Sequence, residues 1–304
     1  MRKINFHFSI FCILLTLLVP TGLYGSQKDS LFIDSFYQIL YSYKFRSADS
    51  LLQQNVRNEI SSSINNLLII SYNWWKIISG ENNPEAIDSL FKKIEANIKA
   101  LEEKHSKTQS NQKEIVQLIF LYSYKSRLHN YQNNRLASFS AFKQSFNYFE
   151  KLNPCDTGYC DMYNFIAGMY YALGGHLQEQ FSPVFLLGIN RSYADKEKGY
   201  SLLEKCTHSK NKQIQIESNY FLMKLYLEVR EDPVSAEKFS GELVKLYPDN
   251  LVFRFNHLLA LYNQDKFDAA EKVYRNLINR ADSNPQLSEK QKEHFREEYN
   301  TLKR

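Results

Sequence analysis

The sequence has little glycine, proline and cysteine for its 304 residues: 10 Gly, 7 Pro and 4 Cys. So few flexible or helix-breaking residues, with no low-complexity segment, argue against a disordered chain or one built mainly of loops. The cysteines lack the paired spacing of a zinc site, and the 7 histidines do not stand at helical metal-binding intervals. Neither a glycine-rich phosphate loop nor a Gly-x-Ser-x-Gly motif is present. The sequence therefore predicts a non-enzymatic protein that needs no cofactor or metal.

The charge distribution and the aromatic content further limit the kinds of protein that this chain could be. The formal net charge is +5, and basic residues are interspersed with acidic ones along the whole chain. This distribution argues against a nucleic-acid surface. The 21 Tyr and 21 Phe indicate aromatic-rich packing between elements of secondary structure.

The longest apolar run near the N-terminus, Phe8 to Val19, is shorter than the roughly 18 residues that a membrane-spanning helix needs. Arg2 and Lys3 precede this run, and small residues up to Gly25 follow it. Such a layout is typical of a secretory signal peptide. We expect residues 1–25 to be cleaved, and the mature chain to be periplasmic or extracellular, soluble and without an integral membrane span.

Apolar residues recur every three or four positions through the rest of the chain, which predicts a succession of amphipathic helices. One helix should end at Gly80, and Pro84 fits the first turn of the next. Helix pairs are irregular over 31–152 and clearer over 160–281. A charged helix over 285–303 has the composition of a terminal cap.

Two of the clearer repeats have the same register. Ala236 and Ala270 are 34 positions apart, each at the same place in a helix-turn-helix pattern, and this spacing is the tetratricopeptide period. Around the second alanine, Phe267-x-x-Ala270-x-x-x-Tyr274 places small and aromatic side chains where two helices should meet.

On these residues the chain resembles exported tetratricopeptide-repeat (TPR) proteins, with good matches over Met162 to Ile278. The resemblance implies an all-α fold, an α-solenoid of stacked helix-turn-helix repeats whose first helices line a concave groove for a partner's peptide or helix. One elongated unit is the expected arrangement. Ser240, Arg254 and His257 depart from the pattern, since large apolar or aromatic residues usually occupy these positions.

One repeat is interrupted. Gly168 and Gly199 match the small-residue positions of a helix pair, and Gly168 would allow close helix approach, but they are 31 positions apart where about 12 are usual. Residues 174–193 are therefore interpreted as an insertion. Its apolar side chains either fold back as core or form a lid, a partner contact or a membrane-touching patch; they include Phe181, Phe185 and Leu186.

The cysteines offer one structural hypothesis. Cys155 and Cys160 flank four residues after a helix-stopping proline, and in an oxidising compartment they could form a local disulfide or remain ordinary thiols. Cys206 occupies a small-residue core position and is expected to be buried and unpaired.

The favoured function is an exported adaptor or assembly factor that binds a segment of an envelope or exported protein. The candidate partner contacts are Asn164, Phe181, Phe185, Leu186, Asn219, Lys224, Arg254 and Asn256. The alternative is a binder of glycans or other non-protein ligands, whose stacking platforms would include Trp74, Trp75, Tyr170 and Tyr193. The partner's identity and the oligomeric state do not follow from the sequence.

Overall fold

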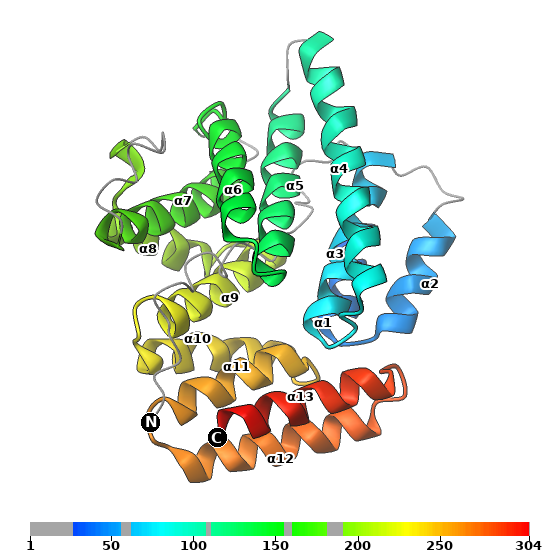
Figure 1. Ribbon diagram of the computed structural model, residues 1–304, viewed down its shortest axis with the longest axis vertical. Coiled ribbons are helices and arrows are strands. Elements are labelled where there is room, and N and C mark those ends of the chain that lie inside the picture. The colour runs from blue at the N-terminus through cyan, green and yellow to red at the C-terminus, as the bar shows by residue number, and fades with distance from the viewer. Residues whose placement is uncertain (1–26, 56–61, 108–110, 155–159, 181–190, 304) are drawn as a thin grey trace. The chain divides into compact units, whose positions relative to one another are not determined.

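The structure is a computed structural model that describes residues 27–55, 62–107, 111–154, 160–180 and 191–303. Every regular element in these ranges is helical (Figure 1). In chain order they are α1 (Gln27–Tyr41), α2 (Phe45–Asn55), α3 (Ser62–Ile78), α4 (Pro84–Lys107), α5 (Gln112–Tyr131), α6 (Arg135–Phe149), α7 (Cys160–Gln180), η4 (Arg191–Tyr193), α8 (Lys196–Cys206), α9 (Lys212–Glu228), α10 (Pro233–Leu246), α11 (Leu251–Tyr262), α12 (Phe267–Ser283) and α13 (Glu289–Leu302). The all-α prediction is confirmed.

The helices fall into two compact units. The central unit comprises Phe91–Arg230, and the terminal unit combines Ser26–Leu90 with Glu231–Arg304. Within each unit, helices that follow one another in the chain pack as neighbours, which is compatible with a helical repeat protein. The terminal unit also joins segments from both ends of the chain, an arrangement that the expectation of one elongated unit did not include.

Several helix pairs share one turn geometry. In four of these turns a non-glycine residue adopts the left-handed conformation two positions before the next helix; these are Tyr43, Asn133, Glu231 and Asp265. At the last of them the Asp265 N–H donates to the Tyr262 carbonyl at 3.0 Å and the Lys266 N–H donates to the Leu261 carbonyl at 3.1 Å. This is the hydrogen-bond pattern of a Schellman motif. The turns at Glu231 and Asp265 are 34 positions apart, so the period seen in the sequence recurs in the backbone.

The turn after α3 follows the prediction at Gly80. Its φ is 108°, the Gly80 N–H donates to the Ile77 carbonyl at 3.1 Å, and the Glu81 N–H donates to the Lys76 carbonyl at 2.9 Å. A left-handed glycine therefore ends the helix, because only glycine adopts this backbone without a Cβ penalty. Pro84 is the first residue of α4, as expected.

In the central unit, α5 and α6 are joined by fully buried serines. The hydroxyls of Ser123 and Ser145 lie 2.9 Å apart, and those of Ser126 and Ser138 lie 3.0 Å apart. Small side chains bring the two helices close, and each hydroxyl is hydrogen-bonded, so its burial carries little penalty.

In the terminal unit, α1 and α3 pack against α11 and the turn that joins α10 to α11. The ring of Tyr41 lies 5.3 Å from that of Trp75 and 5.4 Å from that of Tyr247, and the Trp75 ring lies 5.7 Å from that of Phe253. Asn250, completely buried at the start of α11, donates from its amide to the Tyr41 carbonyl at 3.0 Å. Buried aromatic area and a backbone hydrogen bond therefore hold the two ends of the chain together.

The C-terminal helix α13 buries Phe295 and Tyr299, and the Tyr299 ring stacks on that of Tyr274 at 3.7 Å. It also lies against the end of α3, since a Cβ built on Gly80 would come within 2.6 Å of His294 Cβ. The charged helix that we predicted to be a terminal cap therefore packs against one of the N-terminal helices.

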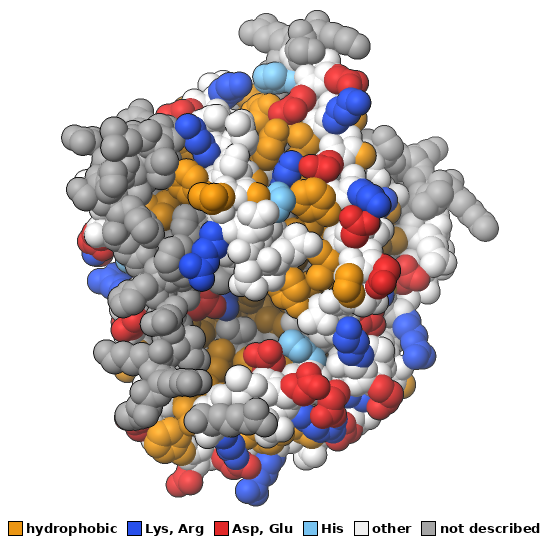
Figure 2. Space-filling view, in the orientation of Figure 1, with side chains coloured by type: hydrophobic (Ala, Val, Ile, Leu, Met, Phe, Trp, Pro, Cys, Tyr) orange, Lys and Arg blue, Asp and Glu red, His pale blue; other side chains and the backbone are white. Residues whose placement is uncertain are grey.

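The surface is mixed in charge. Figure 2 shows acidic and basic side chains lying beside one another on one face, with hydrophobic side chains between them. Among the helices that the structure describes, none is both long enough and apolar enough to cross a membrane.

Candidate functional site

No chemical centre stands out in the described part of the chain, where no group of three or more His, Cys, Asp or Glu side chains could hold a metal ion. The best-defined surface feature lies where α7 meets α8 in the central unit. It is built on an unusually close crossing of the two helices.

Glycine makes that crossing possible. A Cβ built on Gly199 would lie 2.2 Å from the Ala172 backbone nitrogen and 2.7 Å from the Gly168 carbonyl oxygen. A Cβ on Gly168 would in turn lie 2.9 Å from Leu203 Cγ. Real side-chain carbons do not approach so closely, so the α7 and α8 backbones meet where both residues lack a side chain. The expectation that Gly168 allows close approach is confirmed.

The two helices run antiparallel. Ala172 lies beside Gly199 at one end, and at the other the Cys206 thiol lies 3.7 Å from the Asp161 carbonyl oxygen. Cys206 is 3% exposed, which confirms the prediction that it is buried, and burial raises the pKa of its thiol to about 12. This thiol is therefore neutral and unreactive at neutral pH.

The helix α7 is longer than the sequence predicted. It continues through Gln180, whereas residues from 174 onward were assigned to the insertion. A Cβ on Gly174 would lie 2.7 Å from the Tyr193 carbonyl oxygen, and one on Gly175 would lie 2.6 Å from the Lys196 nitrogen. Close packing of these two glycines on the chain that returns to α8 supports the extra helical turns.

Along this crossing runs a surface that we name the α7–α8 strip, comprising Asn164, Tyr171, Tyr193, Lys198 and Lys205. The Lys198 ammonium donates to the Tyr171 hydroxyl at 2.8 Å and lies 4.0 Å from the ring centroid. The Tyr171 and Tyr193 rings are 5.4 Å apart.

Helical spacing extends the strip in both directions. Asn164 precedes Tyr171 by two turns of α7, and Lys205 follows Lys198 by two turns of α8, so each pair shares a helix face. Both lysines are exposed, while Asn164 and the two tyrosines are half-buried. The strip therefore offers amide, phenol and ammonium groups over about two helical turns.

A buried aromatic layer supports the strip. The Tyr193 ring packs edge-on against Phe146 and Phe149, each at 5.2 Å, and Phe149 stacks on Tyr170 at 4.7 Å. Burial, with the nearby Glu150 carboxylate, raises the pKa of the Tyr193 phenol. Tyr193 is thus held neutral, in a fixed orientation, as a hydrogen-bonding group at the edge of a rigid base.

Two of the predicted partner contacts are buried, which corrects the expectation that they face a partner. Asn219 is 5% exposed and its amide donates to the Gln215 carbonyl at 2.7 Å. Asn256 is 6% exposed and its amide donates to the Val252 carbonyl at 2.8 Å. Each amide bonds its own helix four residues back, which satisfies a polar side chain inside the packing.

The other predicted partner-contact residues that the structure describes are half-buried. Lys224 forms an ion pair with Glu228 on α9, and Arg254 donates from Nε to the Pro248 carbonyl at the start of α11. Asn164, Asn219 and Lys224 belong to the central unit, whereas Arg254 and Asn256 belong to the terminal unit. Among the predicted contacts, Asn164 alone belongs to the α7–α8 strip.

Several predictions lie outside the described residues. They are the signal peptide at 1–25, Cys155 with its disulfide to Cys160, and the inserted Phe181, Phe185 and Leu186. Each of these stays a prediction.

The stacking platforms named for a glycan binder are mostly buried. Trp74 is 8% exposed, and Trp75 and Tyr170 are 1% exposed, so these rings serve as core. Tyr193, at the α7–α8 strip, is half-buried.

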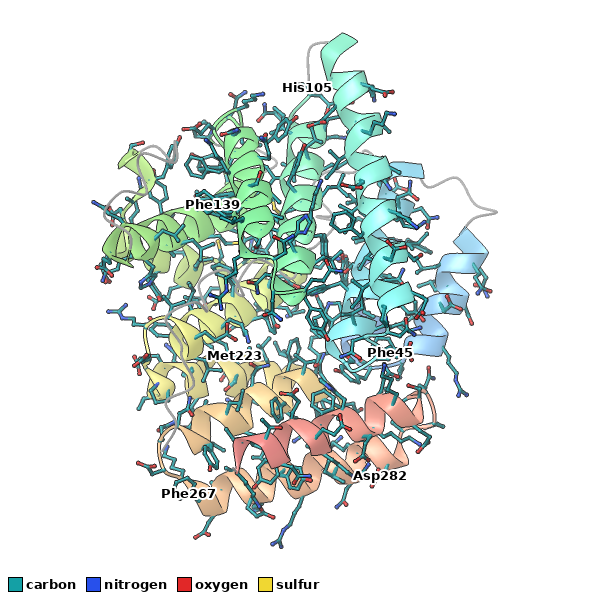
Figure 3. The ribbon with its side chains drawn as sticks, viewed as in Figure 1. Phe45, His105, Phe139, Met223, Phe267 and Asp282 are labelled. Carbon is teal, nitrogen blue, oxygen red and sulfur yellow. The ribbon has the colours of Figure 1, made fainter. Side chains whose placement is uncertain are left out.

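The repeat motif around Ala270 needs one correction. Ala270 is completely buried, as predicted. Phe267, which Figure 3 labels at the start of α12, is 50% exposed. Among the ring contacts of the described residues, its ring packs only against that of Tyr262, at 5.1 Å. The first aromatic position of the motif is thus half exposed at the start of its helix, and is not buried where the two helices meet.

Sequence reasoning missed Tyr171, Lys198 and Lys205. Tyr171 was assigned to the tyrosine position of a repeat, and lysines on a predicted helix carry no special signal. Seven-residue spacing of the two lysines was available in the sequence, but their alignment with Tyr171 required the α7–α8 register.

Comparison with family models, with curated proteins and with solved structures finds no match for this chain. The resemblance to TPR proteins therefore rests on the residues and on the helical pattern.

Proposed function

We propose that this protein is a non-catalytic interaction module of the TPR-like solenoid class, exported from the cytoplasm, that binds a segment of another envelope or exported protein. The observation that carries the proposal is the α7–α8 strip: half-buried tyrosines and exposed lysines held on a rigid aromatic base.

The physical argument concerns pre-organisation. Tyrosine contributes a large contact area and a hydrogen bond at low cost in side-chain entropy, and it is enriched among residues that dominate binding energy. The Tyr193 ring is fixed by Phe146 and Phe149, and Lys198 is fixed by the Tyr171 hydroxyl. These side chains therefore lose little conformational entropy when a partner binds, and a short peptide segment could bind there with useful affinity.

Site-specific crosslinking in intact cells tests this proposal. A photoreactive residue is placed at Tyr193, at Asn164 or at Phe185 of the predicted insertion, and a control is placed at exposed Lys272 in the terminal unit. We expect one envelope protein, identified by mass spectrometry, to be captured from the first three positions and not from Lys272.

A double variant tests whether crosslinking depends on the α7–α8 strip. Tyr171→Ala with Lys198→Ala should abolish capture from Asn164 while circular dichroism shows the helical content unchanged. Absence of any adduct from a folded, abundant protein, or undiminished capture by this variant, would overturn the proposal and make glycan screening the next step.

A further inference from the structure

The two units differ in charge although the sequence mixes both signs. The central unit carries 19 Lys and Arg against 13 Asp and Glu, a formal charge of +6. The terminal unit carries 17 against 20, a formal charge of −3. The contrast emerges only when the two distant segments of the terminal unit are grouped together.

The α8 region contributes to the positive excess. Residues 195–212 contain five lysines and three acidic residues. Two of the acids are engaged close by: Asp195 accepts from the Lys198 backbone N–H at 3.0 Å as the cap of α8, and the Glu197 carboxylate lies 3.6 Å from the Arg230 guanidinium. Lys196 pairs with Glu179. The exposed ammonium groups of Lys198 and Lys205 lie on the face that the α7–α8 strip presents.

The spacing of these two lysines constrains a ligand. Seven residues of α-helix span about 10 Å along the axis. A peptide in the extended polyproline II conformation advances about 3.1 Å per residue with three residues per turn, so carboxylates three positions apart lie on the same side of the peptide and span nearly this distance. The Tyr193 and Tyr171 phenols lie beside the Lys198 end, where a phenol and an ammonium can both bond a carboxylate.

We propose that the segment bound at the α7–α8 strip is acidic and adopts the extended polyproline II conformation, with Asp or Glu side chains at positions i and i+3 that pair with Lys198 and Lys205. This inference rests on the proposed function and specifies the chemistry of its partner. A peptide fits the strip better than an anionic lipid surface does, because Tyr193 packs edge-on against Phe146 and Phe149 and its ring is half-buried, so it cannot insert among acyl chains.

Fluorescence anisotropy provides the test. The probe is a fluorescein-labelled 12-residue Gly/Ser peptide with Glu at every third position, and its matched control has Gln at the same positions. We expect the Glu peptide to bind the full mature chain at least roughly tenfold more tightly than the Gln peptide, with binding weakened by added salt.

Charge variants locate the site. Lys198→Gln with Lys205→Gln should weaken binding of the Glu peptide by roughly tenfold. Lys272→Gln with Lys290→Gln removes the same charge from exposed positions of the terminal unit and should leave binding unchanged. Equal binding of both peptides, or equal weakening by both double variants, would overturn the inference.

Two further outcomes also count against it. In one, phosphatidylglycerol vesicles capture the protein in a Lys198-dependent manner while the Glu peptide does not bind. In the other, light scattering shows salt-sensitive self-association that depends on the same lysines. If crosslinking from Tyr193 still captures a protein partner while the Glu peptide fails, the interaction module stands and only its acidic preference is wrong.

Discussion

Ser240 and His257, two departures from the TPR pattern, contact each other: the Ser240 hydroxyl lies 2.9 Å from Nδ1 of His257. Ser240 is completely buried on α10 and also donates to the Glu237 carbonyl at 3.1 Å. An Nδ1–H donated by the imidazole satisfies both groups. A polar pair thus occupies positions where the resemblance to TPR proteins implies large apolar or aromatic side chains, and each polar group is hydrogen-bonded by the other.

This pairing predicts non-additive substitutions. Ser240→Ala should destabilise the protein by about 1 to 2 kcal/mol, because it leaves a half-buried imidazole nitrogen without its partner. His257→Leu should cost less, since Ser240 keeps its bond within α10. A double-mutant cycle by urea unfolding should give a coupling energy of about 1 kcal/mol. Strictly additive effects would show that the contact contributes nothing.

The glycine crossing of α7 and α8 should tolerate no side chain at Gly199. Gly199→Ala places its Cβ against the backbone of Ala172 and should cost about 3 kcal/mol or more, because neither helix can yield locally. Gly241→Ala is the matched control: its Cβ would lie 3.9 Å from His257 Cε1, an ordinary contact, and should be stabilising by roughly 0.5 to 1 kcal/mol. Thermal unfolding of both variants checks the prediction, which fails if Gly199→Ala melts like the parent.

Asn250 joins the two ends of the chain as well as capping α11. Its side-chain oxygen accepts from the Phe253 N–H at 3.0 Å and its amide donates to the Tyr41 carbonyl. Asn250→Ala should therefore destabilise by about 2 to 3 kcal/mol, from the loss of a cap and of a buried hydrogen bond. Asn134→Ala removes an exposed cap of α6 and should cost about 1 kcal/mol. Equal losses in urea unfolding would argue that the contact with Tyr41 is unimportant.

Acid should weaken the central unit through His176, which is 5% exposed and bonded to the Tyr200 hydroxyl at 3.1 Å. Desolvation lowers the pKa of His176 to about 4, with Glu179 opposing and Lys196 assisting the shift. The unfolded chain therefore takes up a proton first as the pH falls below about 6.5, so stability is lost from there down to about pH 4.

By pH 5 the loss from His176 should reach roughly 2 kcal/mol. His176→Gln can keep a hydrogen bond to Tyr200 but cannot ionise, and it should reduce the difference in unfolding free energy between pH 7 and pH 5 by this amount. His208→Gln changes an exposed residue and should leave the difference as it is in the parent. Unaltered pH dependence in His176→Gln would exclude this residue as the cause.

Export predicts a shortened chain. If residues 1–25 are a signal peptide, protein recovered from the periplasm or the medium should begin at Ser26, because cleavage follows the small residue Gly25. Intact-mass measurement and N-terminal sequencing check this, with cytoplasmic protein made without residues 2–25 as the reference. Full-length protein retained in the cytoplasm of the native source would contradict it.

The sequence by itself determined the local features of this protein. A succession of amphipathic helices, the glycine cap at Gly80, the 34-residue spacing and the buried Cys206 all follow from residues close together in the chain. Backbone sterics, helix capping and hydrophobic periodicity act over one or two turns, so such features can be predicted without knowing which helices become neighbours.

Only the tertiary structure decided which helix faces are covered. The polar residues Asn219 and Asn256 became buried, Tyr171 stayed half-buried beside Lys198, and α13 met the end of α3. Each outcome depends on a neighbour that is distant in the chain or on the register of a helix crossing. Burial depends on how whole helices pack together, and the periodicity of one helix does not specify which other helix will pack against each of its faces.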